Sequence, residues 1–185
     1  MASTDKRDLG WAWGLVFSAR FAMLRGMISQ RLQGYFEDYA SYHRTSGNQW
    51  THYLGIPLIA LGLLGLLSGI ELGLSIPGTL FRLDGGVVLL GLGGLFYLWL
   101  DWKVAIPFLL ILAATYFLSR VFPAQWLWGF FVFGWVLQGV GHYYFEKRSP
   151  AFFKNFTHLL VGPLWIFAKI LGLNGRSRAS GSPKK

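Results

Sequence analysis

The chain has 185 residues, of which 54% are hydrophobic and 18% aromatic, and its formal net charge is +9 at pH 7. The length favours one domain, and this apolar content is too high for an ordinary soluble protein of the same size. The sequence has no cysteine, which excludes disulfide frameworks, thiolate metal sites and cysteine nucleophiles. Because the basic residues flank apolar segments, we expect membrane lipids and not nucleic acid as the partner of this charge.

Residues 1–30 predict a basic amphipathic helix that lies in the membrane interface. Aromatic side chains such as Trp11 and Trp13 would pack into lipid, while Arg20 and Arg25 would face the headgroups. The two arginines interrupt the apolar run, which argues against a cleaved signal peptide.

Four apolar stretches follow, at about 53–74, 86–100, 104–119 and 126–142. The first is long enough to span a bilayer, whereas the middle two are short and are separated only by "DWKV". They would form either a tight helical hairpin or a pair that does not fully cross. We therefore predict an all-α fold, a polytopic membrane bundle of about four transmembrane helices whose embedded domain covers residues 31–172.

The last apolar segment, "HLLVGPLWIFAKILGL", contains Gly162, Pro163 and Lys169. These residues predict an interfacial or re-entrant helix, so that interfacial helices would lie at both ends of the bundle. The polar residues 173–185 predict a disordered tail.

The distribution of Lys and Arg predicts the orientation in the membrane. Six lie before residue 53 and eight after residue 142, whereas only Arg82, Lys103 and Arg120 lie between. The positive-inside rule then puts both termini in the cytoplasm. We expect an integral protein of a bacterial inner membrane or of the endoplasmic reticulum.

The four histidines, His43, His52, His142 and His158, all fall on the same side in this four-crossing topology. Each one alone is more simply explained as an interfacial side chain with an ordinary hydrogen bond. As a set they favour a metal site, because neutral imidazoles suit iron, zinc, copper or nickel.

The first histidine pair flanks a helix break. His43 and His52 are nine positions apart and would point in opposite directions on one uninterrupted helix. The intervening "RTSGN" breaks the helix, so a loop can bring the two rings together. Asn48, four residues before His52, would orient a ligand or contact the substrate. Gln138 and Tyr42 are weaker candidates for such a contact.

The second motif pairs His142 with Glu146, again four residues apart, so the two side chains would project in one direction. A carboxylate near lipid needs a metal, a cationic partner or water. A salt bridge from Glu146 to Arg44 or Lys147 is an equally good interpretation. Together with Asn48, Glu146 is a candidate catalytic residue.

Two motifs carry a resemblance to a known family. "YHRTSGNQWTHYLGIP" has the form Y-H-x4-N-x3-H-x2-G-x-P, and "QGVGHYYFEKRSPA" has the form Q-x2-G-H-x3-E-x3-P-A. Together they resemble the small membrane family typified by the fungal endoplasmic-reticulum 2-hydroxy fatty acid dioxygenase, from about residue 30 to residue 170.

The resemblance implies an Fe(II)-dependent dioxygenase that uses O2 to shorten a long-chain 2-hydroxy fatty acid by one carbon, at the cytoplasmic edge of the membrane. It implies His43, His52 and His142 as ligands of iron, with His158 as the natural fourth. The basic N-terminal helix is longer than the family core requires, which leaves the exact lipid open. The alternative is a non-catalytic membrane protein that binds haem or a structural metal through the same histidines.

Overall fold

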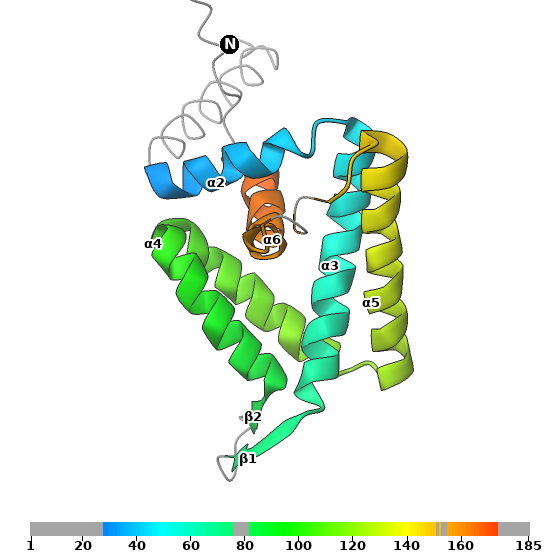
Figure 1. Ribbon diagram of the computed structural model, residues 1–185. Coiled ribbons are helices and arrows are strands. Elements are labelled where there is room, and N and C mark those ends of the chain that lie inside the picture. Colours follow the sequence, from blue (N-terminus) through cyan, green and yellow to red (C-terminus); the bar gives the residue numbers. More distant parts are fainter. Residues whose placement is uncertain (1–27, 76–81, 151, 153–154, 174–185) are drawn as a thin grey trace, which may run out of the picture.

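The computed structural model describes residues 28–75, 82–150, 152 and 155–173 (Figure 1). The interfacial helix expected over residues 1–30 and the tail expected over 173–185 therefore lie almost wholly outside the described residues. In chain order the elements are α2 (Gln30–Ser41), α3 (Ser46–Ser68), β1 (Glu71–Ser75), β2 (Arg82–Asp84), α4 (Gly85–Ser119), α5 (Ala124–Gly139), the π-helix η1 (Val140–Glu146) and α6 (Thr157–Ile170).

Two helices of the described residues, α3 and α4, are long and apolar enough to cross a membrane. Only 28% and 33% of their most apolar windows are buried inside the protein. Most of each window is therefore exposed, and its apolar side chains point outward, as they do in lipid-facing helices. The core helix of a soluble protein would instead be mostly buried. The larger number of about four crossings stays a prediction.

Helix α4 consists of two arms that meet at a sharp reversal (Figure 1). Asp101 leaves the helical conformation there, with φ −165° and ψ 105°, and its carboxylate accepts hydrogen bonds from the backbone N–H groups of Lys103 at 3.0 Å and Ser29 at 2.6 Å. Across the arms, the rings of Tyr97 and Phe108 lie 5.0 Å apart. This is the tight helical hairpin that the short "DWKV" segment allowed.

Helices α3 and α5 pack with their backbones in near contact. A Cβ atom placed on Gly134 would lie 2.7 Å from the carbonyl oxygen of Gly55, and one on Gly62 would lie 2.6 Å from that of Leu127. No larger residue fits at these positions without moving a helix. The close approach brings together the helix that carries His52 and the helix that leads to His142.

The described residues are mostly helical, as expected, and they add one short two-stranded sheet that the sequence did not predict. Helix α3 ends at Ser68, short of the apolar stretch predicted to run to residue 74, and β1 pairs antiparallel with β2. Gly73 lies in β1 with a positive φ of 77°, a conformation that glycine adopts without steric cost. After β2, Asp84 begins α4 by accepting a hydrogen bond from the Val87 N–H at 2.9 Å.

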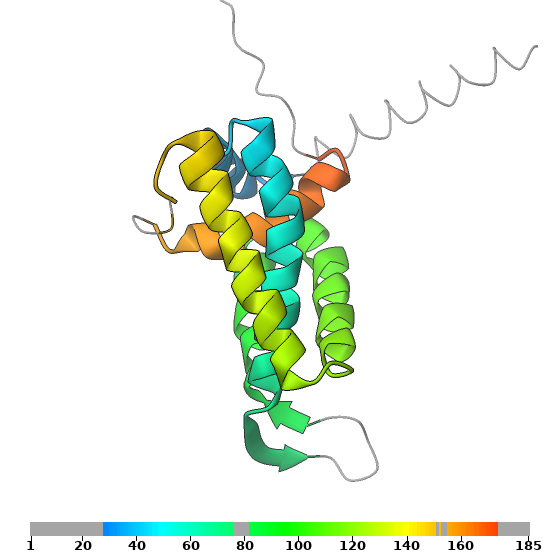
Figure 2. The same cartoon turned by 90° about the vertical axis from the view of Figure 1, so that its right-hand side faces the viewer.

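Helix α6 corresponds to the last apolar segment, for which an interfacial or re-entrant position stays a prediction. It runs across the bundle, roughly perpendicular to α3 and α5 (Figure 2), and it contacts α2, α3 and α4. Leu164 and Ala168 in its middle are fully buried. Burial of these apolar side chains against three other helices stabilises its crosswise position.

Candidate metal centre

Three of the four histidines meet at the end of the bundle formed by α2, η1 and the start of α3. His43 follows the end of α2, His52 lies in α3 and His142 lies in η1. All three are buried, and one ligand atom from each lies within 4.8 Å of those from the other two. The helix break at residues 42–45, capped by Thr45, turns the chain so that His43 faces His52.

The first two rings are held by backbone carbonyl groups. His43 Nδ1 lies 2.7 Å from the Tyr39 carbonyl oxygen, and His52 Nδ1 lies 2.8 Å from that of Asn48. A carbonyl oxygen only accepts hydrogen bonds, so each Nδ1 carries the proton and each Nε2 carries a lone pair. The two Nε2 atoms lie 3.1 Å apart, where two lone pairs repel each other unless a cation lies between them.

The charge state of His43 also favours a metal ligand. Burial lowers the pKa of His43 to about 4, although its backbone hydrogen bond to Tyr39 opposes this effect. The imidazole is therefore neutral near pH 7, as a metal ligand must be.

His142 completes the cluster from a π-helix. Its ring centroid lies 4.9 Å from those of both His43 and His52. Its Nδ1 is buried and has no hydrogen-bond partner within the described part of the chain. Its carbonyl oxygen accepts a hydrogen bond from the Arg148 N–H at 3.1 Å, just beyond the end of η1. Single π-helical turns are rare and occur often at functional sites.

Glu146 ties η1 to the start of α3. Its carboxylate accepts hydrogen bonds from the backbone N–H groups of Arg44 and Thr45 at 3.1 Å, from Thr45 Oγ1 at 2.8 Å and from Asn48 Nδ2 at 3.1 Å. Burial raises the pKa of Glu146, but these hydrogen bonds outweigh it and lower the pKa to about 2. The contacts of Glu146 within the described residues thus come from uncharged groups, and the expected salt bridge to Arg44 or Lys147 is not among them.

Asn48 connects this clamp to the cluster. Its side chain is fully buried and donates a hydrogen bond to the Glu146 carboxylate. Its backbone carbonyl oxygen accepts a hydrogen bond from His52 Nδ1 and so orients the His52 ring. Neither Asn48 nor Glu146 is among the described residues that line the cavity beside the histidines. Their catalytic role stays a prediction, and their observed contacts fix the positions of His52 and η1.

His158 lies outside the group of three. It is on α6, where its Nε2 lies 2.8 Å from the Asp38 carboxylate. Its Nδ1 is buried, and none of the residues that the structure describes pairs with it. Tyr39 contacts both regions, since its ring stacks on His43 at 3.9 Å and lies 5.6 Å from His158. The sequence did not single out Tyr39, although it precedes His43 by one helical turn.

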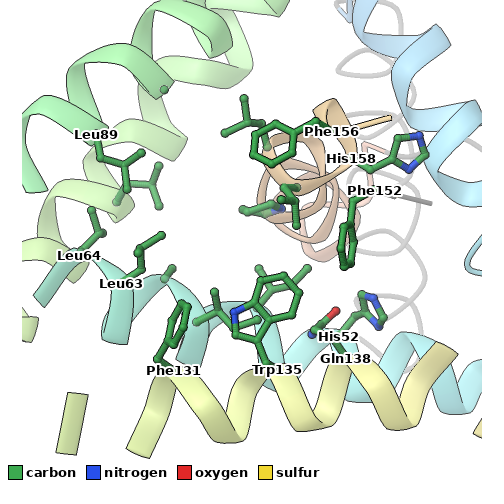
Figure 3. Close-up of a pocket in the computed structure, with 18 of the residues that line it drawn as sticks. His52, Leu63, Leu64, Leu89, Phe131, Trp135, Gln138, Phe152, Phe156 and His158 are labelled. Carbon is green, nitrogen blue, oxygen red and sulfur yellow. The ribbon is translucent and has the colours of Figure 1, made fainter. Parts of the chain in front are cut away.

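A cavity of about 340 Å³ begins at the histidines and extends between α3, α4 and α5 (Figure 3). His52 and Gln138 lie at one end, and apolar side chains such as Leu63, Leu89 and Phe131 line the other. The arrangement suits a molecule with one polar end and a long apolar tail.

Comparison with known families gives a match over residues 29–173 to the model described as "2-hydroxy-palmitic acid dioxygenase Mpo1-like". The chain belongs to the Mpo1-like family. No curated protein and no solved structure matches it. The family model extends over most of this Mpo1-like chain and includes every histidine of the sequence.

The donor set of the Mpo1-like chain fits a transition metal. Three neutral imidazoles converge, two of them held in one tautomer by backbone carbonyl groups, and the sequence has no thiolate to compete. Such ligands suit iron, zinc, copper or nickel, and the donor set by itself does not select among them.

Proposed function

We propose that the protein is an Fe(II)-dependent dioxygenase that shortens long-chain 2-hydroxy fatty acids by one carbon. The family membership supports the reaction class. The observation that carries the proposal is the pair of Nε2 atoms of His43 and His52, 3.1 Å apart at the end of an apolar cavity. Two ligands of one ion, with bonds of about 2.1 Å at nearly a right angle, have about this separation.

His43, His52 and His142 would hold the iron in this proposal. Bound there, iron would supply the Lewis acidity that binds a hydroxy acid and the redox chemistry that O2 requires. The backbone carbonyl groups of Tyr39 and Asn48 keep two of the rings in the tautomer that binds metal. Whether His158 is a fourth ligand stays a prediction, since its Nε2 is paired with Asp38.

The cavity supports an acyl substrate. Its apolar part would take the hydrocarbon tail, in which each buried methylene contributes about 0.8 kcal/mol, and the head would meet the histidines (Figure 3). Balanced as a whole, a 2-hydroxy acid and one O2 give the acid one carbon shorter, CO2 and water. This stoichiometry needs no external reductant.

Haem fits the cluster poorly. The three histidine rings contact each other edge to face, with centroids 4.5 to 4.9 Å apart, which leaves no slot for a planar macrocycle among them. Axial haem ligands lie on opposite faces of the iron, about 4 Å apart for bonds of about 2 Å. The Nε2 atoms of His43 and His52 are closer than that.

We further propose that the chain spans a membrane with both termini in the cytoplasm. Lys103 lies at the α4 reversal, which faces α2 (Figure 1), and Arg44 and Lys147 lie beside the histidine cluster. Arg120 follows the C-terminal end of α4, at the end of the bundle opposite to the reversal (Figure 1). The excess of basic residues at the histidine end supports a cytoplasmic location for that end.

The test is to purify the full chain in detergent without chelator, measure its metals and supply substrate with O2. Stoichiometric iron is expected, together with conversion of 2-hydroxypalmitic acid to the 15-carbon acid and release of the C1 carbon as CO2. A metal-loaded protein that takes up no O2 with any long-chain 2-hydroxy acid would favour the non-catalytic metal-binding alternative.

A further inference from the structure

Gln138 has a buried side-chain amide whose N–H group makes no hydrogen bond to the described residues. Its side chain is only 6% exposed, and its Nε2 is buried with no hydrogen-bond partner among the described residues. An unpaired buried amide group destabilises a fold, because it has lost its hydrogen bonds to water without replacement. Such a group needs an explanation, and one explanation is a ligand that pairs with it when bound.

The position of Gln138 supports that explanation. It lies on α5 one turn before His142, and it lines the cavity beside His52 (Figure 3). Gly55 on α3 faces it, and a Cβ atom on Gly55 would clash with Gln138 Nε2. The Nε2 end of the amide therefore packs against the α3 backbone at Gly55, and any larger residue at position 55 would displace it.

Some of the other polar groups near this end are already engaged, whereas the Nδ1 atoms of His142 and His158 have no hydrogen-bond partner among the described residues. The Nδ1 atoms of His43 and His52 bind backbone carbonyl oxygens, and Asn48 Nδ2 binds Glu146. Gln138 Nε2, which packs against Gly55, thus has an N–H without a partner among the described residues, and a half-turn of the amide presents this donor to the cavity. As a neutral donor it pairs with a carboxylate oxygen without placing a second charge near the apolar lining.

We propose that Gln138 recognises the head of the ligand by donating a hydrogen bond from Nε2 to a carboxylate oxygen. This inference rests on the proposed function for the identity of the ligand, a long-chain 2-hydroxy acid. It makes Gln138 a specificity-determining residue, because an unfunctionalised chain of the same length leaves the buried amide unpaired. Sites built around a polar contact discriminate strongly against ligands that lack the partner group.

The experiment measures ligand binding and not turnover. Full-length protein with its metal bound is titrated without O2, by displacement of a fluorescent fatty acid, with 2-hydroxypalmitic acid and with hexadecane. The variants are Gln138→Leu, which removes the amide, and Gln138→Glu, which keeps its size but replaces the donor by a carboxylate. Gln125→Leu is the matched control, because Gln125 lies exposed on the same helix. Metal content is measured for every variant.

We expect Gln138→Leu to weaken binding of the acid about ten- to a hundredfold, as for loss of a hydrogen bond to a charged group. Hexadecane binding and metal content should not change, and Gln125→Leu should match the wild type. Gln138→Glu should weaken acid binding at least as much, and it provides the test if the leucine variant does not fold. Unchanged acid binding in the variants, or an equal loss for hexadecane, overturns the proposal.

Two further outcomes separate this proposal from the proposed function. A wild type that binds the acid but consumes no O2 in air contradicts the dioxygenase, while weaker acid binding by the Gln138 variants still supports the recognition role. If the wild type turns over the acid and the Gln138 variants bind the acid with normal affinity, only the proposed role of Gln138 is contradicted. A wild type that does not bind the acid overturns the proposal for Gln138.

Discussion

The Nε2 atoms of His43 and His52 lie 3.1 Å apart while the opposite nitrogen of each ring contacts a backbone carbonyl oxygen. Both lone pairs therefore face the same point. The arrangement is unfavourable for two neutral rings alone and favourable around a cation. The helix break between α2 and α3 makes it possible, because it turns His43 towards His52.

Replacing His52 by Ala should remove the metal, because its Nε2 is one of the converging ligand atoms. We expect metal content after dialysis to fall by more than about tenfold. The His158→Ala variant should lose less metal, since His158 lies outside the group of three and pairs with Asp38. Equal loss in both variants, measured by elemental analysis, would make His158 a ligand and support the four-histidine set.

Gly141→Ala should disturb the cluster through crowding. The added methyl group would lie 2.5 Å from Asn48 Oδ1 and 3.2 Å from His52 Nδ1. Overpacking of this kind costs about 1 to 3 kcal/mol, so the Tm and the metal content should both fall. The control is Gly139→Ala, where a Cβ atom meets nothing within 4 Å. A similar Tm for the two variants would contradict the close contact at residue 141.

The Glu146 clamp predicts acid sensitivity. The folded pKa of about 2 lies below the ordinary value of 4.5, so the unfolded chain takes up a proton at a higher pH than the folded chain. The stability that Glu146 contributes is full above pH 4.5 and is lost as the pH falls towards 2. Thermal unfolding of detergent-solubilised protein between pH 6 and 3 should show a steeper loss for the wild type than for Glu146→Gln. Parallel curves would contradict the clamp.

Leu89→Trp should shift the preferred chain length. Leu89 lines the apolar end of the cavity (Figure 3), and a larger side chain there leaves less room for the tail. Each excluded methylene lowers affinity about fourfold, so kcat/KM should fall for 16-carbon acids more than for 12-carbon acids. The control is Val88→Trp, because Val88 is exposed. An unchanged chain-length profile for Leu89→Trp would place the tail elsewhere.

Reporter fusions should place both ends of the chain in the cytoplasm, given the six and eight basic residues near the two ends. A reporter inserted between α4 and α5 should report the opposite side, because Arg120 lies at the end of the bundle away from the histidines. Termini on opposite sides would contradict an even number of crossings.

The sequence predicted the helix break at the first motif correctly. The break lies slightly before the expected "RTSGN", because α2 ends at Ser41 and α3 already begins at Ser46, so that Gly47 and Asn48 are helical. The short "DWKV" segment likewise indicated the reversal at Asp101. Both signals are local, since they depend on a few adjacent residues.

Features that depend on tertiary contacts were not predictable in the same way. The π-helix is maintained by the contact of Glu146 with Arg44 and Thr45, about a hundred residues away. The crosswise path of α6 depends on its packing against three other helices, and it carries His158 towards Asp38. No periodicity within the segment encodes these partners.

The contact between Gly55 and Gly134 affects how the protein responds to its surroundings. The α3–α5 pair is separated at this point by backbone atoms, without intervening side chains that change rotamer. In the proposed membrane-spanning arrangement, lateral pressure from the bilayer therefore finds few side chains to compress between α3 and α5, and we expect the two helices to move as one body. Deformation should instead appear around the cavity, on the side of α4, so a change in bilayer thickness should alter access for the lipid tail more than the spacing of His52 and His142.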